Sequence, residues 1–100
     1  MTDKQFDDAF TAAGGWFILT QYETIVEWTG MKKDLVDYIF ALGFDQKRTG
    51  SSTCVSSTLK IIQENRTRDA LVKIRDSKSI NRQHPEAAAM AANLLYRLNL

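Results

Sequence analysis

The chain has 100 residues, the length of one domain; 44% of them are hydrophobic and 25% are charged, which excludes a disordered composition. No apolar run approaches the length of a membrane span, and the first residues lack the basic and apolar regions of a secretory signal. The formal net charge is only +1. These properties predict one cytoplasmic domain over residues 1–100 that does not bind a membrane.

The sequence contains one cysteine, Cys54, and one histidine, His84. A single cysteine cannot form an internal disulfide or a thiolate zinc site, so we expect a buried thiol in a reducing compartment. A Cys54–His84 nucleophile pair is conceivable, but nothing near Cys54 in the sequence would activate the thiol. No glycine-rich phosphate-binding loop is present. We therefore predict a protein that is not an enzyme and that binds neither a metal nor a cofactor.

The amino-terminal segment has the pattern of a short capped helix. Thr2 and Gln5 have the spacing of a capping box, in which a hydroxyl and an amide bind the free backbone N–H groups. Apolar residues then recur at helical spacing until Gly14, which ends the predicted helix. The segment Trp16–Leu19 is too short to assign by its period, so it is either a brief extended segment or the lead-in to the next helix.

Two further helices are predicted on either side of Gly30. Residues Thr20–Glu23 form a second capping-box pattern, which starts a helix that Gly30 ends. The expected buried face of this helix is Tyr22, Ile25, Val26 and Thr29. The next helix runs from about Lys32 to Leu42, and its expected buried face is Leu35, Val36, Ile39 and Phe40. Gly43 then has the place of a left-handed residue, after which Phe44 can pack back on the last turn.

The second half of the chain is more polar. Residues 45–52 are predicted as a loop, and a fourth helix begins among the hydroxyl residues 51–53. Its apolar positions are Val55, Leu59 and Ile62. Thr67 is expected to cap a short fifth helix, whose apolar positions are Ala70, Leu71 and Ile74. Residues 76–83 are again predicted as a loop, and Pro85 suits the first position of a sixth helix that continues almost to the end of the chain.

The stretch between Tyr22 and Ala41 resembles the helix-turn-helix motif, in which two short helices cross steeply around a tight turn. The matching positions are Ile25 near the end of the first helix, Gly30 in the turn, Met31 directly after it, and Val36 and Ile39 in the second helix. The resemblance implies a positive φ at Gly30 and a buried Met31. Val26 departs from the motif, which prefers Ala or Gly where the helices approach most closely, so a plain αα-hairpin is the alternative.

The predicted fold is therefore all-α. We expect a small single-domain bundle of about five to six short helices with a helix-turn-helix-like core, and a short β-segment or wing within residues 44–57 is compatible with the pattern.

If the resemblance holds, the second helix of the motif would face the major groove of DNA. Its outer side carries Lys32, Lys33 and Tyr38, which suit phosphates, base edges and sugar-phosphate. The same side carries Asp34 and Asp37, which the phosphates would repel. This mixed face is equally compatible with a protein partner.

The basic residues of the second half are further candidates. Residues 1–46 hold three Lys/Arg and eight Asp/Glu, a balance of −5, whereas residues 47–82 hold nine and three, a balance of +6. Lys47 and Arg48 could contact the DNA backbone as a wing does, or lie in a solvated connector. Arg66 and Arg68 extend the basic region, which could instead dock on the acidic half of the chain. Some of this charge could also be paired locally, as Glu64–Arg68 and Asp69–Lys73.

The carboxy-terminal helix offers a competing site, because Leu94, Leu95 and Leu98 crowd its last turns. These leucines either complete the core of the chain or pack against a second copy of the chain or another protein. The leading hypothesis is a small non-enzymatic regulatory protein that binds duplex DNA, alone or as a homodimer. The alternative is a protein-interaction module or small inhibitor that uses its charge asymmetry or its leucine-rich end.

Overall fold

The computed structural model describes all 100 residues and contains seven helices and no strand. The helices are α1 (Asp3–Ala13), α2 (Gly15–Glu27), α3 (Lys32–Ala41), α4 (Arg48–Gln63), α5 (Thr67–Asp76), α6 (Lys78–Gln83) and α7 (Ala87–Arg97). The prediction of a small all-α domain is confirmed, with one helix more than expected and without a β-segment or wing. None of the helices has the length and apolar character needed to cross a membrane.

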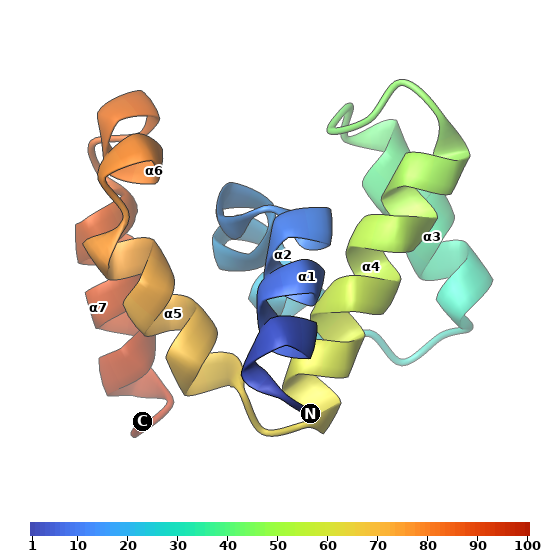
Figure 1. Ribbon diagram of the computed structural model, residues 1–100. Helices are drawn as coiled ribbons and strands as arrows, with labels where there is room; N and C mark the ends of the chain where they lie inside the picture. The colour runs from blue at the N-terminus through green and yellow to red at the C-terminus, as the bar shows by residue number, and fades with distance from the viewer.

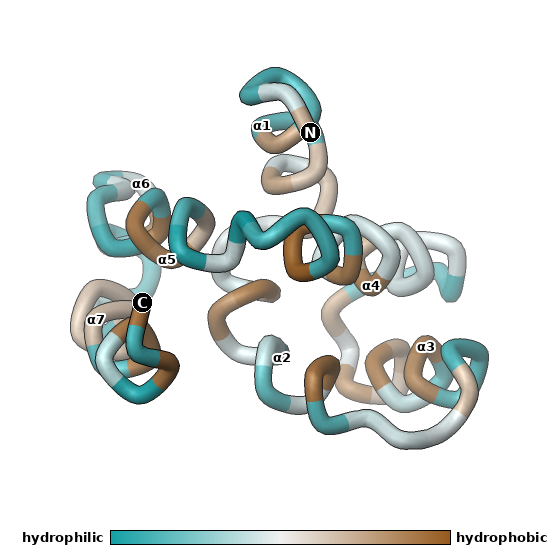
Figure 2. The backbone as a smooth tube through the Cα atoms, turned by 90° about the horizontal axis from the view of Figure 1, so that it is seen from below, coloured by the Kyte–Doolittle hydropathy of each residue, from teal (hydrophilic) through white to brown (hydrophobic).

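Two groups of helices flank a central pair (Figures 1 and 2). α3 and α4 lie together on one side, α5, α6 and α7 lie on the other, and α1 and α2 lie between them. The most extensive packing is that of α1 on α4, α5 on α7 and α3 on α4, while α2 contacts α4, α5 and α7. One cluster of 22 buried hydrophobic residues runs through these interfaces. The domain therefore has a single core with α2 at its centre.

Trp16–Leu19 is helical, because α2 begins directly after the turn that ends α1. The predicted capping box is present, since Gln5 N donates to Thr2 Oγ1 (3.1 Å) and Thr2 N donates to Gln5 Oε1 (2.9 Å). Gly14 takes a φ of 87°, and α2 starts at the next residue, so Trp16–Leu19 is the lead-in to this helix. The second predicted capping box is wrong, because Thr20 lies inside α2, where its hydroxyl donates to Trp16 O (2.9 Å).

The turn between α2 and α3 differs from the motif in two residues. The φ of Gly30 is not positive, because the chain leaves α2 through the extended residue Trp28 and needs no left-handed residue here. Trp28 Nε1 donates to Met31 O (3.1 Å) and holds the turn. Met31, expected to be buried, is 69% exposed, and Val26 is half exposed. Thr29 lies beyond the end of α2. α3 packs mainly on α4 rather than on α2.

α3 presents the predicted buried stripe of Leu35, Val36 and Ile39 to α4. Phe40, also expected to be buried, is 37% exposed because it lies at the edge of this stripe. Gly43 has the predicted positive φ of 87°. Phe44 then places its ring edge-on against Phe17 of α2, with 5.3 Å between the ring centroids, and so joins the end of α3 to the core.

α4 begins at Arg48, so most of the loop predicted for residues 45–52 is helical. Asp45 holds the first turn, since its Oδ2 accepts a hydrogen bond from Ser51 Oγ (3.1 Å). The side of α4 that packs in the interior includes Ser51, and also Thr58, whose hydroxyl donates to Cys54 O (2.9 Å). Hydroxyl residues thus line a buried helix face because their donors are satisfied locally, and this polar composition concealed the start of the helix.

The last three helices begin at other residues than expected. α5 starts at Thr67 itself, which is therefore not its cap. Residues 78–83, predicted as a loop, form α6 behind Ser77, whose Oγ accepts from Ile80 N (3.2 Å). α7 starts at Ala87, two residues after Pro85. The serine cap of α6 was the signal in the sequence that could have predicted this helix.

Candidate functional site

The candidate DNA-binding residues of α3 lie on one exposed surface with the start of α4. We call the α3–α4 surface the set Lys32, Lys33, Asp34, Asp37, Tyr38, Lys47 and Arg48, all of which are exposed. Arg48 joins the two helices, because its Nε donates to Asp37 Oδ1 (2.6 Å) and its Nη2 to Lys33 O (3.3 Å). Lys32 Nζ donates to Ser56 Oγ of α4 (2.6 Å). The residues named from the sequence are therefore exposed, and Lys32 and Arg48 contact the neighbouring helix.

The positive charge of this surface is smaller than its four basic residues suggest. Arg48 and Asp37 neutralise each other, and both carboxylates of the surface lie among the lysines. Lys33 and Lys47 are the two cations of this surface whose side chains make neither an ion pair nor a hydrogen bond within the chain, because Lys32 binds Ser56. Arg48 belongs to the first turn of α4 and is fixed by two contacts, so the expectation of a wing or a solvated connector is wrong for this residue.

Large apolar side chains also gather on α3 and the turn before it; three of them are exposed, and Trp28 is partly buried against the core. We call the apolar flank the residues Trp28, Met31, Tyr38 and Leu42, which lie on one side of α3 and on the turn before it. Met31, Tyr38 and Leu42 are 69%, 46% and 47% exposed, and the Trp28 and Tyr38 rings lie 5.7 Å apart. Of this set, the sequence analysis named only Tyr38 as a binding candidate, and it expected Met31 to be buried. Apolar period alone does not distinguish a residue that faces the core from one that faces an open side.

The second group of basic candidates lies at the other end of α4. The helix has 16 residues. At 1.5 Å per residue its length of about 24 Å separates Arg48 from Arg66. Arg66 is held against the protein, because its guanidinium pairs with Asp69 and with Asp3 (3.2 Å) and lies 4.5 Å from the centre of the Phe6 ring. Arg68 is exposed and makes no ion pair.

Three ion pairs join carboxylates of residues 1–46 to basic side chains of residues 47–82. Carboxylates of α1 reach cations of α5, as Asp3–Arg66 and Asp7–Lys73 (2.9 Å). The two local pairs considered from the sequence are both wrong: Lys73 binds Asp7 rather than Asp69, and Glu64 lies 3.6 Å from the amino terminus rather than on Arg68. Lys73 binds Asp7 because its side chain extends over the Phe6 and Phe10 rings of α1, which brings Nζ to the Asp7 carboxylate.

The leucines of α7 mostly complete the core. Leu94 and Leu95 are buried, whereas Leu98 is partly buried against the same cluster. Of these three leucines, therefore, only Leu98 offers surface area to another molecule.

Cys54 and His84 lie in different parts of the molecule and do not form a pair. Cys54 is buried on α4, with Sγ 3.8 Å from Asp45 Oδ2. Its burial, followed by the charge of Asp45, raises the pKa of the thiol to about 11, which keeps it neutral and a poor nucleophile. His84 stacks on Trp16, with 3.7 Å between the rings. No three His, Cys, Asp or Glu side chains come close enough together to hold a metal ion.

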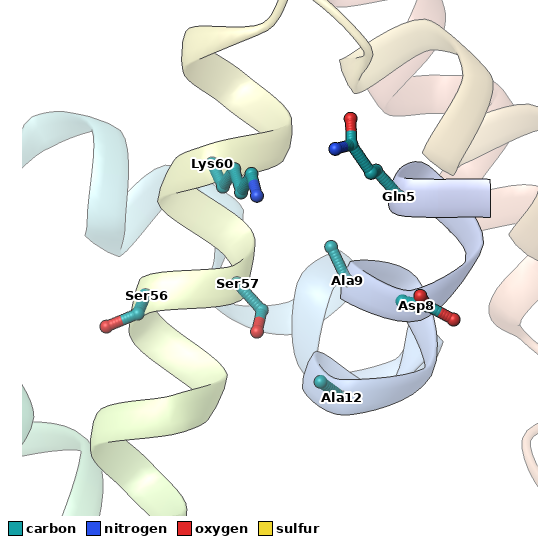
Figure 3. Close-up of a pocket in the computed structure, with 7 residues that line it drawn as sticks. All are labelled: Gln5, Asp8, Ala9, Ala12, Ser56, Ser57 and Lys60. Atoms are coloured by element: carbon teal, nitrogen blue, oxygen red, sulfur yellow. The ribbon is translucent and has the colours of Figure 1, made fainter. Parts of the chain in front are cut away.

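A shallow hollow of about 340 Å³ lies between α1 and α4 (Figure 3). Lys60 and Ser57 point from α4 toward α1, where Ala9 and Ala12 form the floor. Asp8 is turned to its partner Lys4, at 2.9 Å. The hollow offers one unpaired cation over two methyl groups and no buried polar group aimed into it, so it does not present a specific binding site.

No protein-family model matches the chain, and no curated protein or solved structure is significantly similar to it.

Proposed function

We propose that the chain is a small protein-interaction module without catalytic activity, and that the apolar flank of α3 binds the partner. The observation that carries the proposal is the exposure of Met31, Tyr38 and Leu42 on one side of a helix whose other side is packed. Aromatic residues and Met are enriched at the centres of protein interfaces. Exposed apolar side chains that cluster in this way lower the free energy of association when a partner covers them.

The charge beside the flank defines the chemistry of the partner. Asp34 lies three residues after Met31 and four before Tyr38, so it borders both on the helix surface. Its carboxylate makes no ion pair within the chain, and neither does that of Glu27, which precedes Trp28. A complementary partner is an amphipathic helix with Lys or Arg beside its apolar stripe, laid along α3.

Binding of duplex DNA is the second candidate function. The observation that favours it is that Arg48 brings Lys33 and Lys47 together at one end of α3. Two unpaired lysines beside a neutralised arginine support only a few phosphate contacts, and the two exposed carboxylates of α3 oppose them. Of the apolar flank only Tyr38 has a role in DNA binding, which is why we rank this function second.

A peptide titration tests the first function. We would add a helical Leu/Lys peptide and its Leu/Glu counterpart to the ¹⁵N-labelled chain and record amide shifts. The Leu/Lys peptide should shift residues 31–42 and bind at least about 10-fold more tightly than the Leu/Glu peptide. Asp34→Lys should reverse the preference, while Glu86→Lys, which alters an exposed carboxylate without an ion pair, should leave it unchanged. Equal binding of both peptides, or shifts outside α3, would overturn the proposal.

A DNA titration tests the second function. If Lys47 and Arg48 contact phosphates, Lys47→Glu/Arg48→Glu should weaken binding of a mixed-sequence duplex and reduce the slope of log K against log salt by about 1–2. A titration with wild-type protein that stays flat even at about 50 mM salt would exclude DNA binding.

A further inference from the structure

Two hollows lie side by side near the end of α7 and the start of α5. Their volumes are about 280 and 210 Å³. Tyr22 and Leu98 line both of them, so the two hollows are neighbours, and we call them together the α7 cleft. The α7 cleft contains none of the residues of the α3–α4 surface and none of the apolar flank.

Two residues that line the α7 cleft, Tyr22 and Thr67, carry hydroxyl groups without a partner in the chain. Tyr22 and Thr67 are each only 9% exposed, and neither hydroxyl makes a hydrogen bond within the chain. Every fully buried side-chain nitrogen or oxygen of this protein does have a hydrogen-bond partner. The Tyr22 and Thr67 hydroxyls therefore reach the open space of the cleft, where a ligand can bind them.

The same end of the cleft is electropositive. α5 begins here, and its N-cap residue Arg66 provides no side-chain cap. Ala70 is the first residue of α5 whose backbone N–H finds an acceptor, Arg66 O (3.0 Å), so the N–H groups of residues 67–69 are free. Arg68 lines the cleft and makes no ion pair, while the carboxylate of Asp69 is already paired with Arg66. A helix N-terminus with an adjacent free guanidinium favours an anion.

The remainder of the cleft is apolar near α5 and mixed along α7. Ile62, Leu98 and Leu100 line the part near α5. Val26 and Leu94 line the part along α7 together with Glu27 and the Glu23–Arg97 ion pair. We infer that the α7 cleft binds a small amphipathic anion. Its carboxylate or phosphate head accepts hydrogen bonds from residues 67–69, Arg68 and the Tyr22 hydroxyl, and its short alkyl chain lies over Leu98 toward Val26.

The test is a series of titrations of the ¹⁵N-labelled full chain, with each probe kept below its micelle-forming concentration. Octanoate and octyl phosphate distinguish the two heads, inorganic phosphate lacks the chain, and octanol lacks the charge. At least one of the two amphipathic anions should shift the amides of residues 67–69. Its affinity should rise about 4-fold for each added methylene until the cleft is full. Inorganic phosphate and octanol should each bind at least about 10-fold more weakly.

Two variants with a matched control locate the head group. Arg68→Ala should weaken binding by roughly 10-fold or more, and Tyr22→Phe should weaken it several-fold while the fold is retained. Arg82→Ala, which removes another exposed arginine without an ion pair, should change nothing. Overturning results are no shifts at residues 67–69, equal binding of octanol and octanoate, or an affinity that Arg68→Ala leaves unchanged. None of these results bears on the apolar flank, so the two proposals fail independently.

Discussion

Asn81 offers the sharpest test of how the last three helices are held together. Its Nδ2 donates to the carbonyls of Ile74 (3.1 Å), Arg75 (3.2 Å) and Ser77 (2.7 Å). Its Oδ1 accepts from the backbone N–H of Ala88 (2.7 Å). One side chain in α6 thus satisfies the end of α5 and the start of α7, where backbone groups lack helical partners.

Replacing Asn81 with Ala should lower the free energy of unfolding by about 2–3 kcal/mol. An amide has two N–H donors, so three nearby carbonyls share two hydrogen bonds, and the carbonyl oxygen makes a third. Each is worth about 1 kcal/mol when the groups are partly buried. For a domain of this size the corresponding fall in Tm is about 10–20 °C. Asn81→Asp should cost more at neutral pH, because a carboxylate would face the same three carbonyls.

Urea unfolding followed by circular dichroism measures these differences, with Asn93→Ala as the control. Asn93 is exposed on α7 and makes no hydrogen bond within the chain, so its replacement reports only the change in helix propensity, which is well below 1 kcal/mol. If Asn81→Ala and Asn93→Ala unfold at the same urea concentration, the side chain of Asn81 does not join the three helices and the reasoning is refuted.

Three further predictions concern the core. Ile39→Asp should lower the free energy of unfolding by roughly 3–5 kcal/mol, because it buries an unpaired charge. Asp37→Ala should lower it by less than about 1 kcal/mol, because the ion pair of Asp37 is exposed. Equal thermal midpoints of the two variants would contradict this prediction. Gly15→Ala should lower the free energy of unfolding by about 1–3 kcal/mol, because the added methyl group would overlap Cδ1 of Ile80. The double variant Gly15→Ala/Ile80→Val should lose less stability than the two single variants added together. If the losses add in thermal melts, the two side chains do not touch. The pKa of Cys54 is raised in the folded protein, so the thiol ionises first in the unfolded chain, near pH 9. The free energy of unfolding should therefore fall as pH rises from about 9 through about 11. Cys54→Ala should lose less stability over this range, and identical pH profiles of the variant and the wild type would refute the prediction.

Much of the local structure follows from the sequence alone. The capping box at Thr2 and the positive φ at Gly43 are as predicted, and so is the buried stripe around Ile39. These features depend on residues at most four positions apart, because helical hydrogen bonds and caps connect only such neighbours. The exposed face of α3, with Lys33 and Tyr38, follows from the same period.

The tertiary structure decided which surfaces are covered and which charges are paired. Nothing in the local pattern shows that α3 packs on α4 and leaves Met31 exposed, or that Asp7 of α1 meets Lys73 of α5. The α7 cleft likewise joins Tyr22 of α2 to residues more than forty positions later in the chain. A residue's burial and its ion-pair partner depend on helices that approach it only when the chain is folded, and no periodicity within one helix encodes their position.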